Sequence, residues 1–104
     1  MAAMVMARRI KLGMEGSATC ICTEANTARA MGSGSLDVFA TPAMVALIEK
    51  AACNSLLLPD GSTSVGTAVC VQHLAATSLA RTVSARATIT AVESDGRAVV
   101  FDVE

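Results

Sequence analysis

The stretch "TPAMVALIEKAACNSLL", residues 41–57, decides how this chain of 104 residues folds. Thr41 is a good helix N-cap, and Pro42 fits the first helical position, where its missing N–H costs no hydrogen bond. Apolar residues recur at helical spacing and fill much of the remaining circumference: Met44, Val45, Ala46, Leu47, Ile48, Ala51, Ala52 and Cys53. Because a helix that is apolar nearly all round is typical of the centre of a fold, we predict a central, buried helix here.

Strands are predicted on both sides of this helix. Apolar and polar residues alternate in "MEGSATCICTEA" (14–25) before it, and again over residues 63–74, 79–92 and 97–104 after it. Asp95-Gly96 is a hairpin turn between the last two strands. The residues expected to face the helix from the 79–92 strand are Val83, Ala85, Ala87, Ile89 and Ala91. The order of elements predicts an α+β fold, an antiparallel sheet wrapped over one helix.

The composition limits the class of protein. The chain is 53% hydrophobic, with Phe39 and Phe101 as its only aromatic residues, so its core has few large anchors and we expect it to associate. A net charge of −1 argues against nucleic-acid binding. No run approaches the length of a membrane span, and the N-terminal charges follow the short apolar piece, which is the wrong order for a signal peptide. We therefore expect a soluble cytoplasmic protein with no membrane partner.

Four cysteines raise the possibility of a metal site: Cys20, Cys22, Cys53 and Cys70. The first two point to the same face of a predicted strand and form no CxxC motif, and the chain has a single histidine. A zinc site is therefore poorly supported, and we expect no metal and no cofactor. In a reducing cytoplasm such cysteines are expected to be small buried hydrophobes.

His73, the only histidine, falls on the apolar side of the predicted 63–74 strand, in register with Val65, Val69 and Val71. Two interpretations are open at this position. The first is a packed core or interface histidine, and the second is a base or hydrogen-bond donor, since imidazole titrates near neutral pH. The periodicity alone favours the packed histidine.

Three further residues have alternative interpretations. Glu49 has apolar neighbours one helical turn away on either side, so it either reaches solvent or is a carboxylate held at an interface for catalysis. Gly66 interrupts a strand, either to pack against the helix or to let a thioester carbonyl approach the backbone. Thr41 is explained by capping alone. Because it lies about 12 Å from Glu49 along the helix axis, a histidine and a substrate would have to bridge the two.

The segments "ATPAMVALIEKAAC" (40–53) and "GSTSVGTAVCVQHLAAT" (61–77) resemble the fluoroacetyl-CoA thioesterase-like branch of the hot-dog superfamily. The resemblance extends from about residue 13 to residue 104. It implies a hot-dog fold, an antiparallel sheet around one long helix, and a homodimer with active sites at the subunit interface. Related chains usually continue past "FDVE" into a further strand, so we expect residues 1–104 to form a single domain that lacks this C-terminal strand.

The resemblance also implies hydrolysis of a short acyl-CoA thioester. Thr41 corresponds to a nucleophile or acyl-positioning hydroxyl, His73 to the base, and Glu49 to the group that activates water or stabilises an acyl intermediate. Gly66 corresponds to a substrate contact, and Phe39 is a candidate for the acyl site, although a core position is the simpler explanation. The alternatives are a non-catalytic module that binds acyl-CoA or another small ligand, and a purely structural dimerisation domain.

Overall fold

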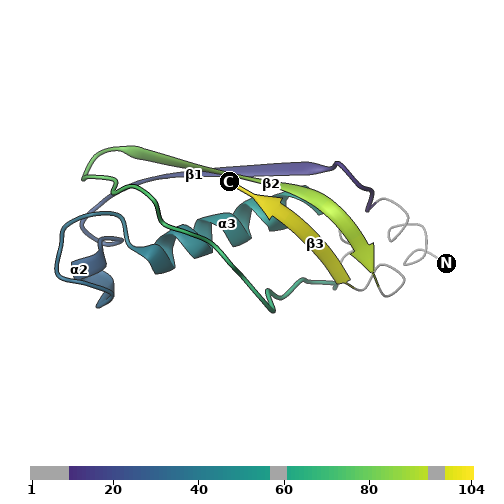
Figure 1. Ribbon diagram of the computed structural model, residues 1–104, viewed down its shortest axis with the longest axis horizontal. Coiled ribbons are helices and arrows are strands. Elements are labelled where there is room, and N and C mark those ends of the chain that lie inside the picture. The colour runs from purple at the N-terminus through teal and green to yellow at the C-terminus, as the bar shows by residue number, and fades with distance from the viewer. Residues whose placement is uncertain (1–9, 57–60, 94–97) are drawn as a thin grey trace.

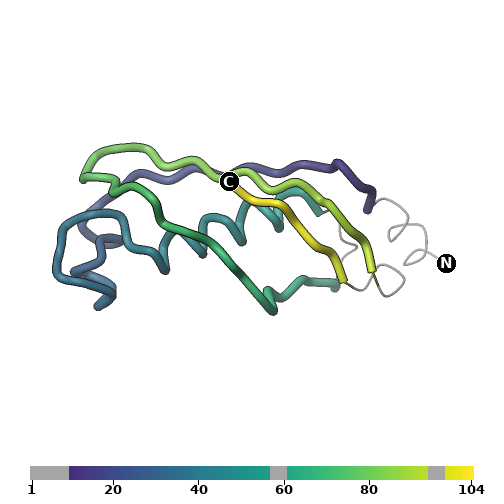
Figure 2. The backbone as a smooth tube through the Cα atoms, viewed as in Figure 1, coloured from purple at the N-terminus to yellow at the C-terminus, as the bar shows by residue number. Residues whose placement is uncertain are grey.

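A three-stranded antiparallel sheet covers one long helix in the computed structural model, which describes residues 10–56, 61–93 and 98–104 (Figure 1). The elements in chain order are β1 (Glu15–Ile21), α2 (Ala28–Met31), α3 (Thr41–Ser55), β2 (Thr82–Glu93) and β3 (Ala98–Val103). The strands are ordered β1-β2-β3, and α3 lies along one face of the sheet (Figure 2). The predicted α+β arrangement is therefore confirmed. Within the described ranges, no helix has the length and apolar character needed to cross a membrane.

The core lies between α3 and the inner face of β2. Leu47, Ile48 and Ala51 of the helix are buried against Ala85 and Ala87 of the strand. Every residue predicted to face inward from β2 is buried or half-buried, so the strand has the expected orientation. Small side chains on both sides let the helix and the sheet approach closely.

Gly16 marks the closest approach between β1 and α3. A Cβ atom at this position would lie 2.2 Å from the carbonyl oxygen of Ala51 and 2.4 Å from the amide nitrogen of Ser55. Both of these are backbone atoms, which cannot move aside without shifting the helix. Only glycine therefore allows β1 to rest directly on the last turns of α3.

The bounds of α3 differ from those predicted. Ala40, with extended backbone, is the N-cap residue, so Thr41 is the first helical residue and Pro42 the second. The helix ends at Ser55, and Leu56 is again extended. The sheet covers only one side of the helix, and the opposite side is exposed in the single chain, including Ala46, Glu49, Lys50, Cys53 and Asn54. The prediction of a helix buried all round is therefore wrong for the isolated chain.

The predicted strand over residues 63–74 is also wrong. These residues run along α3 without joining the sheet, and the segment 61–81 forms a single isolated bridge, between Ser78 and Val38 (Figure 1). Val65 is 80% exposed and Val69 45% exposed, so the predicted inward face is not covered. The physical reason is that a strand needs a neighbour for its backbone groups, and no described strand lies beside this segment. The predicted Asp95-Gly96 turn lies outside the described residues.

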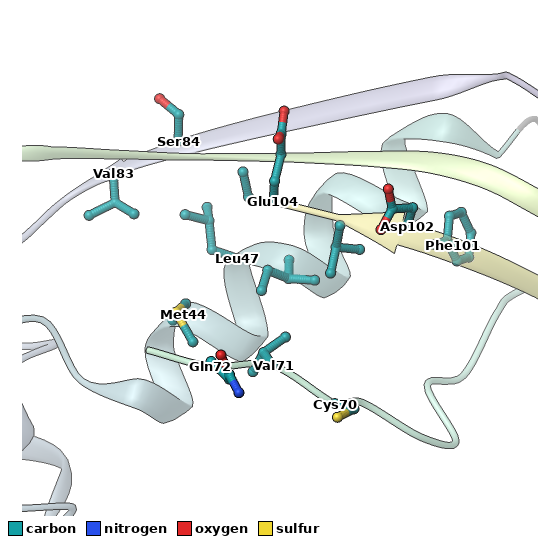
Figure 3. A pocket seen from close by; sticks show the side chains of 13 residues that line it. Met44, Leu47, Cys70, Val71, Gln72, Val83, Ser84, Phe101, Asp102 and Glu104 are labelled. Carbon is teal, nitrogen blue, oxygen red and sulfur yellow. The ribbon is translucent and has the colours of Figure 1, made fainter. Parts of the chain in front are cut away.

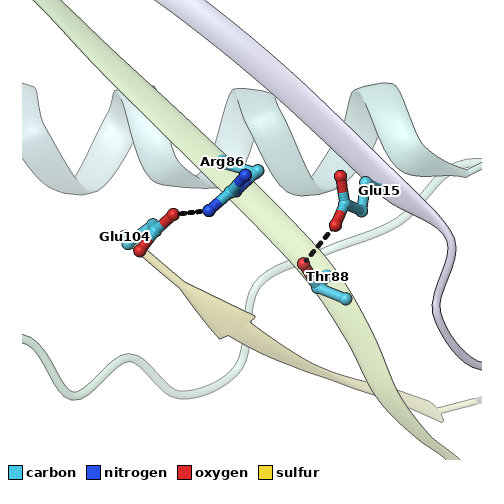
Figure 4. A network of polar contacts seen from close by, with 4 residues as sticks. All are labelled: Glu15, Arg86, Thr88 and Glu104. Atoms are coloured by element: carbon cyan, nitrogen blue, oxygen red, sulfur yellow. Dashed lines mark hydrogen bonds and ion pairs between the residues drawn. The ribbon is translucent and has the colours of Figure 1, made fainter.

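The outer face of β2 is mainly polar. Arg86 of β2 forms an ion pair with Glu104, and Thr88 donates a hydrogen bond of 3.5 Å to Glu15 of β1 (Figure 4). These contacts link β2 to both of its neighbours. Exposed pairs of this kind contribute at most about 1 kcal/mol each, so burial beneath the sheet contributes more to stability.

The cysteines divide into two groups. Cys22 is buried and Cys20 half-buried, whereas Cys53 and Cys70 are exposed, so the prediction of four buried thiols is wrong for the last two. Cys53 lies on the side of α3 that the sheet does not cover, and Cys70 lies on the segment 61–81, which does not join the sheet. Burial raises the pKa of the Cys20 thiol, the neighbouring Cys22 raises it further, and Lys50 lowers it. No cluster of metal-ligating side chains occurs among the described residues.

Candidate active site

Thr41 and His73 form a hydrogen bond at the start of α3. Thr41 Oγ1 lies 2.8 Å from His73 Nδ1, although the two residues are 32 positions apart in the chain. The shift of the N-cap to Ala40 accounts for this contact, because the Thr41 hydroxyl is not engaged in capping the helix. A hydroxyl hydrogen-bonded to an imidazole is the arrangement that activates a hydroxyl as a nucleophile.

Glu49 and Gly66 form a second contact on the exposed side of α3. A Cβ atom at Gly66 would lie 2.9 Å from Oε2 and 3.2 Å from Cδ of Glu49. The glycine therefore lets the backbone of the 61–77 segment rest against a carboxylate. Of the two interpretations of Gly66, the close approach to the helix is the one seen in the single chain, and the helix contributes the Glu49 side chain to it.

A pocket of about 260 Å³ that is open to solvent in the single chain, called the cavity below, lies beside the Thr41–His73 pair. Its wall comes from α2 and the turn after it, from the residues before α3, and from the residues after His73. The lining residues are Ala28, Ser33, Val38, Phe39, Thr41, His73, Leu74, Ala75 and Ala76. Glu49 and Gly66 do not line it. Within one chain the predicted site residues thus form two separate pairs.

Phe39 contributes both to the core and to this cavity. It is 2% exposed, and its N–H donates a hydrogen bond of 2.8 Å to the carbonyl of Thr77. The residue also lines the cavity next to Thr41. The core interpretation is therefore correct, and a role of Phe39 at the acyl site stays a prediction.

A larger groove of about 530 Å³ lies between α3, β3 and residues 70–72. Met44, Leu47, Val71 and Val83 face it from the helix, the segment and β2 (Figure 3). The sequence contains no motif for this groove or for the small residues of the cavity, since both are assembled from segments far apart in the chain. Alanines such as Ala28 and Ala76 also carry no chemical group that could have marked them.

A family model described as fluoroacetyl-CoA-specific thioesterase matches residues 22–104, which is most of the chain. The chain belongs to this thioesterase family. The expected hot-dog fold and enzyme class are thereby confirmed, and the thioesterase is a hydrolase of acyl-CoA thioesters.

Solved structures agree with this assignment. A phenylalanine-to-alanine variant of the fluoroacetyl-CoA-specific thioesterase FlK, in complex with fluoroacetate and CoA, is 30% identical with a TM-score of 0.82, covering 90% of this chain and 80% of that chain. A threonine-to-serine variant in complex with acetyl-CoA is 32% identical with a TM-score of 0.72, covering 81% and 69%. A further structure of the fluoroacetyl-CoA thioesterase is 27% identical with a TM-score of 0.75, covering 90% and 84%. No curated protein sequence matches the chain.

Proposed function

We propose that the thioesterase hydrolyses a short acyl-CoA as a homodimer of single hot-dog domains, with Thr41, His73 and Glu49 as its catalytic residues. The observation that carries the proposal is the 2.8 Å contact between Thr41 Oγ1 and His73 Nδ1 beside a cavity. The complexes of structural relatives with CoA, fluoroacetate and acetyl-CoA support an acyl-CoA ligand. The exposed thiols of Cys53 and Cys70 suit a reducing cytoplasm.

In the proposed reaction His73 Nδ1 accepts the proton of the Thr41 hydroxyl while Oγ1 attacks the thioester carbonyl carbon. The carbon–sulfur bond breaks, and His73 returns the proton to the departing CoA sulfur. Glu49 then orients and deprotonates a water molecule, whose oxygen attacks the acyl carbon of the acyl-threonine. The bond from that carbon to Oγ1 breaks, Glu49 returns the proton to Oγ1, and the free acid leaves. In the first turn of α3, Pro42 has no N–H and the Met44 N–H donates to the Ala40 carbonyl, so the backbone N–H groups of Thr41 and Ala43 are the candidates to stabilise the oxyanion next to Thr41.

A second subunit is needed to bring Glu49 into this reaction. Glu49 lies about 12 Å from Thr41 along the axis of α3 and outside the cavity that Thr41 lines. We propose that Glu49 and Gly66 of one copy cover the Thr41–His73 cavity of the other. Residues 61–70 are exposed and belong to no strand of the sheet, so their backbone is available to pair with a copy of itself. The single chain is also less compact than a typical domain of its length, since its radius of gyration is 15.6 Å and the value for 100 residues is about 13 Å. We take this open shape as support for a second subunit.

A thiol-release assay over a panel of acyl-CoA esters tests the proposal. We expect His73→Ala to reduce turnover at least a hundredfold, because the Thr41 hydroxyl loses its base, while the variant still dimerises. Thr41→Ser keeps the hydroxyl and should retain most activity, whereas Thr41→Val should lose it. Saturable acyl-CoA binding by the wild type without release of CoA would instead identify a non-catalytic binding module and contradict the proposed reaction.

A further inference from the structure

Short side chains form much of the wall around the Thr41–His73 cavity. They come from α2 and its following turn and from the residues after His73, namely Ala28, Ser33, Ala75 and Ala76. Apart from His73, no lining residue has an ionisable side chain. An acyl group that carried a carboxylate would therefore find no cationic partner among them. The lining is matched to an uncharged acyl group.

The α2 side of this wall is held firmly in place. Thr27 is 3% exposed, and its hydroxyl accepts a hydrogen bond of 3.1 Å from an N–H in the first turn of α2. The N–H of Ala28 donates to the carbonyl of Val38 at 2.8 Å. Arg29 and Asp37 form an ion pair of 2.9 Å across the same loop. A wall fixed by these contacts cannot easily retreat from a larger ligand.

Ala28 occupies a particular place in this wall, because the chain folds back directly behind it. A Cβ atom at Gly34 would lie only 3.3 Å from the Ala28 Cβ atom. The loop therefore leaves little room on the Gly34 side of the Ala28 methyl group, and Ala28 also lines the cavity. A larger side chain at position 28 would therefore reduce the volume of the cavity.

We propose that Ala28 sets the longest acyl chain that the thioesterase accepts, and that this chain is short and uncharged. The inference rests on the proposed function, since it places the acyl group in the cavity beside Thr41 and His73. A volume of about 260 Å³ is below the range of about 300–1,000 Å³ typical of sites for drug-sized ligands, so it suits a short chain. Ala28 is a specificity-determining residue in this view, without a part in the chemical step.

The test compares kcat/KM for acyl-CoA esters from acetyl to octanoyl, together with succinyl-CoA, in the wild type and in Ala28→Val. Each buried methylene should raise kcat/KM of the wild type about fourfold until the cavity is full. Ala28→Val should move the optimum to a shorter chain, reduce kcat/KM at least tenfold for the wild type's best ester, and leave acetyl-CoA within about threefold. Succinyl-CoA should be a poor substrate of both.

Control variants separate specificity from folding. Ala30→Val alters an exposed residue of α2 outside the lining and should leave the chain-length profile unchanged. If Ala28→Val does not fold, Ala76→Leu fills the same cavity from an exposed position and must also shift the optimum to shorter chains. An equal loss on every ester, or an unchanged optimum in a folded variant, would overturn the inference while leaving the proposed function intact. Absence of turnover by the wild type on the whole panel would overturn the proposed function, and the inference with it.

Discussion

Gly66 is the residue at which a single added methyl group tests the candidate site most directly. Its Cβ would lie 2.9 Å from the Glu49 carboxylate, so Gly66→Ala must push that side chain aside. We expect the variant to lose at least tenfold in turnover with little change in melting temperature, because both residues lie on an exposed side of the molecule. The measurement is thiol release, with Thr67→Ala as the neighbouring control.

A double-mutant cycle shows whether this loss acts through Glu49. In a Glu49→Ala background the same Gly66→Ala change should have almost no further effect, since the displaced carboxylate is already absent. Additive losses would show that Gly66 affects turnover independently of Glu49.

At the scale of the secondary-structure elements, the contact between β1 and α3 contributes to the free energy of unfolding. Gly16→Ala places a methyl group on the backbone of the last helical turns, so the strand and the helix must separate. We expect a loss of about 3 kcal/mol in the free energy of unfolding, at the upper end of typical overpacking costs. Urea denaturation followed by circular dichroism measures it. Ser17→Ala, one residue along and exposed, should change stability by less than about 0.5 kcal/mol.

Among the described residues, two side-chain hydrogen bonds link the 61–77 segment to α3. Thr41 and His73 meet near one end, and near the other Cys53 Sγ lies 3.5 Å from Ser64 Oγ, two residues before Gly66. We expect Cys53→Ala to lower kcat a few-fold, because the segment is then less well fixed beside Glu49, while Cys53→Ser restores most of the loss. Cys70→Ala alters the other exposed thiol, which lies on the segment itself, and serves as the control. A kcat equal to that of the wild type in Cys53→Ala would show that this contact is dispensable.

The elements differ in how far the sequence predicts them. Helical spacing in α3 and alternation in β2 follow from side chains that pack on each other, so the faces by which the two elements meet could be predicted, whereas the exposure of the far side of α3 could not. Alternation over residues 63–74 predicts only which way each side chain would point, and it says nothing about whether a neighbouring strand is present. For the proposed site, the family resemblance indicates Thr41 and His73, whereas nothing in the sequence indicates Ala28, because an alanine in a cavity wall has no distinguishing pattern.

At the scale of the whole molecule, the 61–77 segment matters because it leaves apolar side chains exposed in the single chain. Val69 is 45% exposed there, on a segment proposed to meet its copy in the dimer. We expect Val69→Lys to produce a monomer in light scattering after gel filtration and to lower turnover at least tenfold, since Glu49 of the partner is then lost. Val100→Lys alters a similarly exposed valine of β3 and should remain dimeric. A dimer that persists in Val69→Lys would place the subunit contact elsewhere.

The pairing of β1 with β2 has a consequence for synthesis of the chain. Partners in this ladder, such as Ile21 and Thr82, are about sixty to seventy residues apart, so the sheet cannot begin to form until most of the chain has left the ribosome. The helix α3 emerges before β2, and Leu47 and Ile48 then face water until Ala85 and Ala87 arrive to cover them. Pairing over such separations is slow and leaves apolar surface open to aggregation. The nascent protein is thus most vulnerable during the interval between translation of its helix and of its second strand, when chaperones would have the greatest effect on its yield.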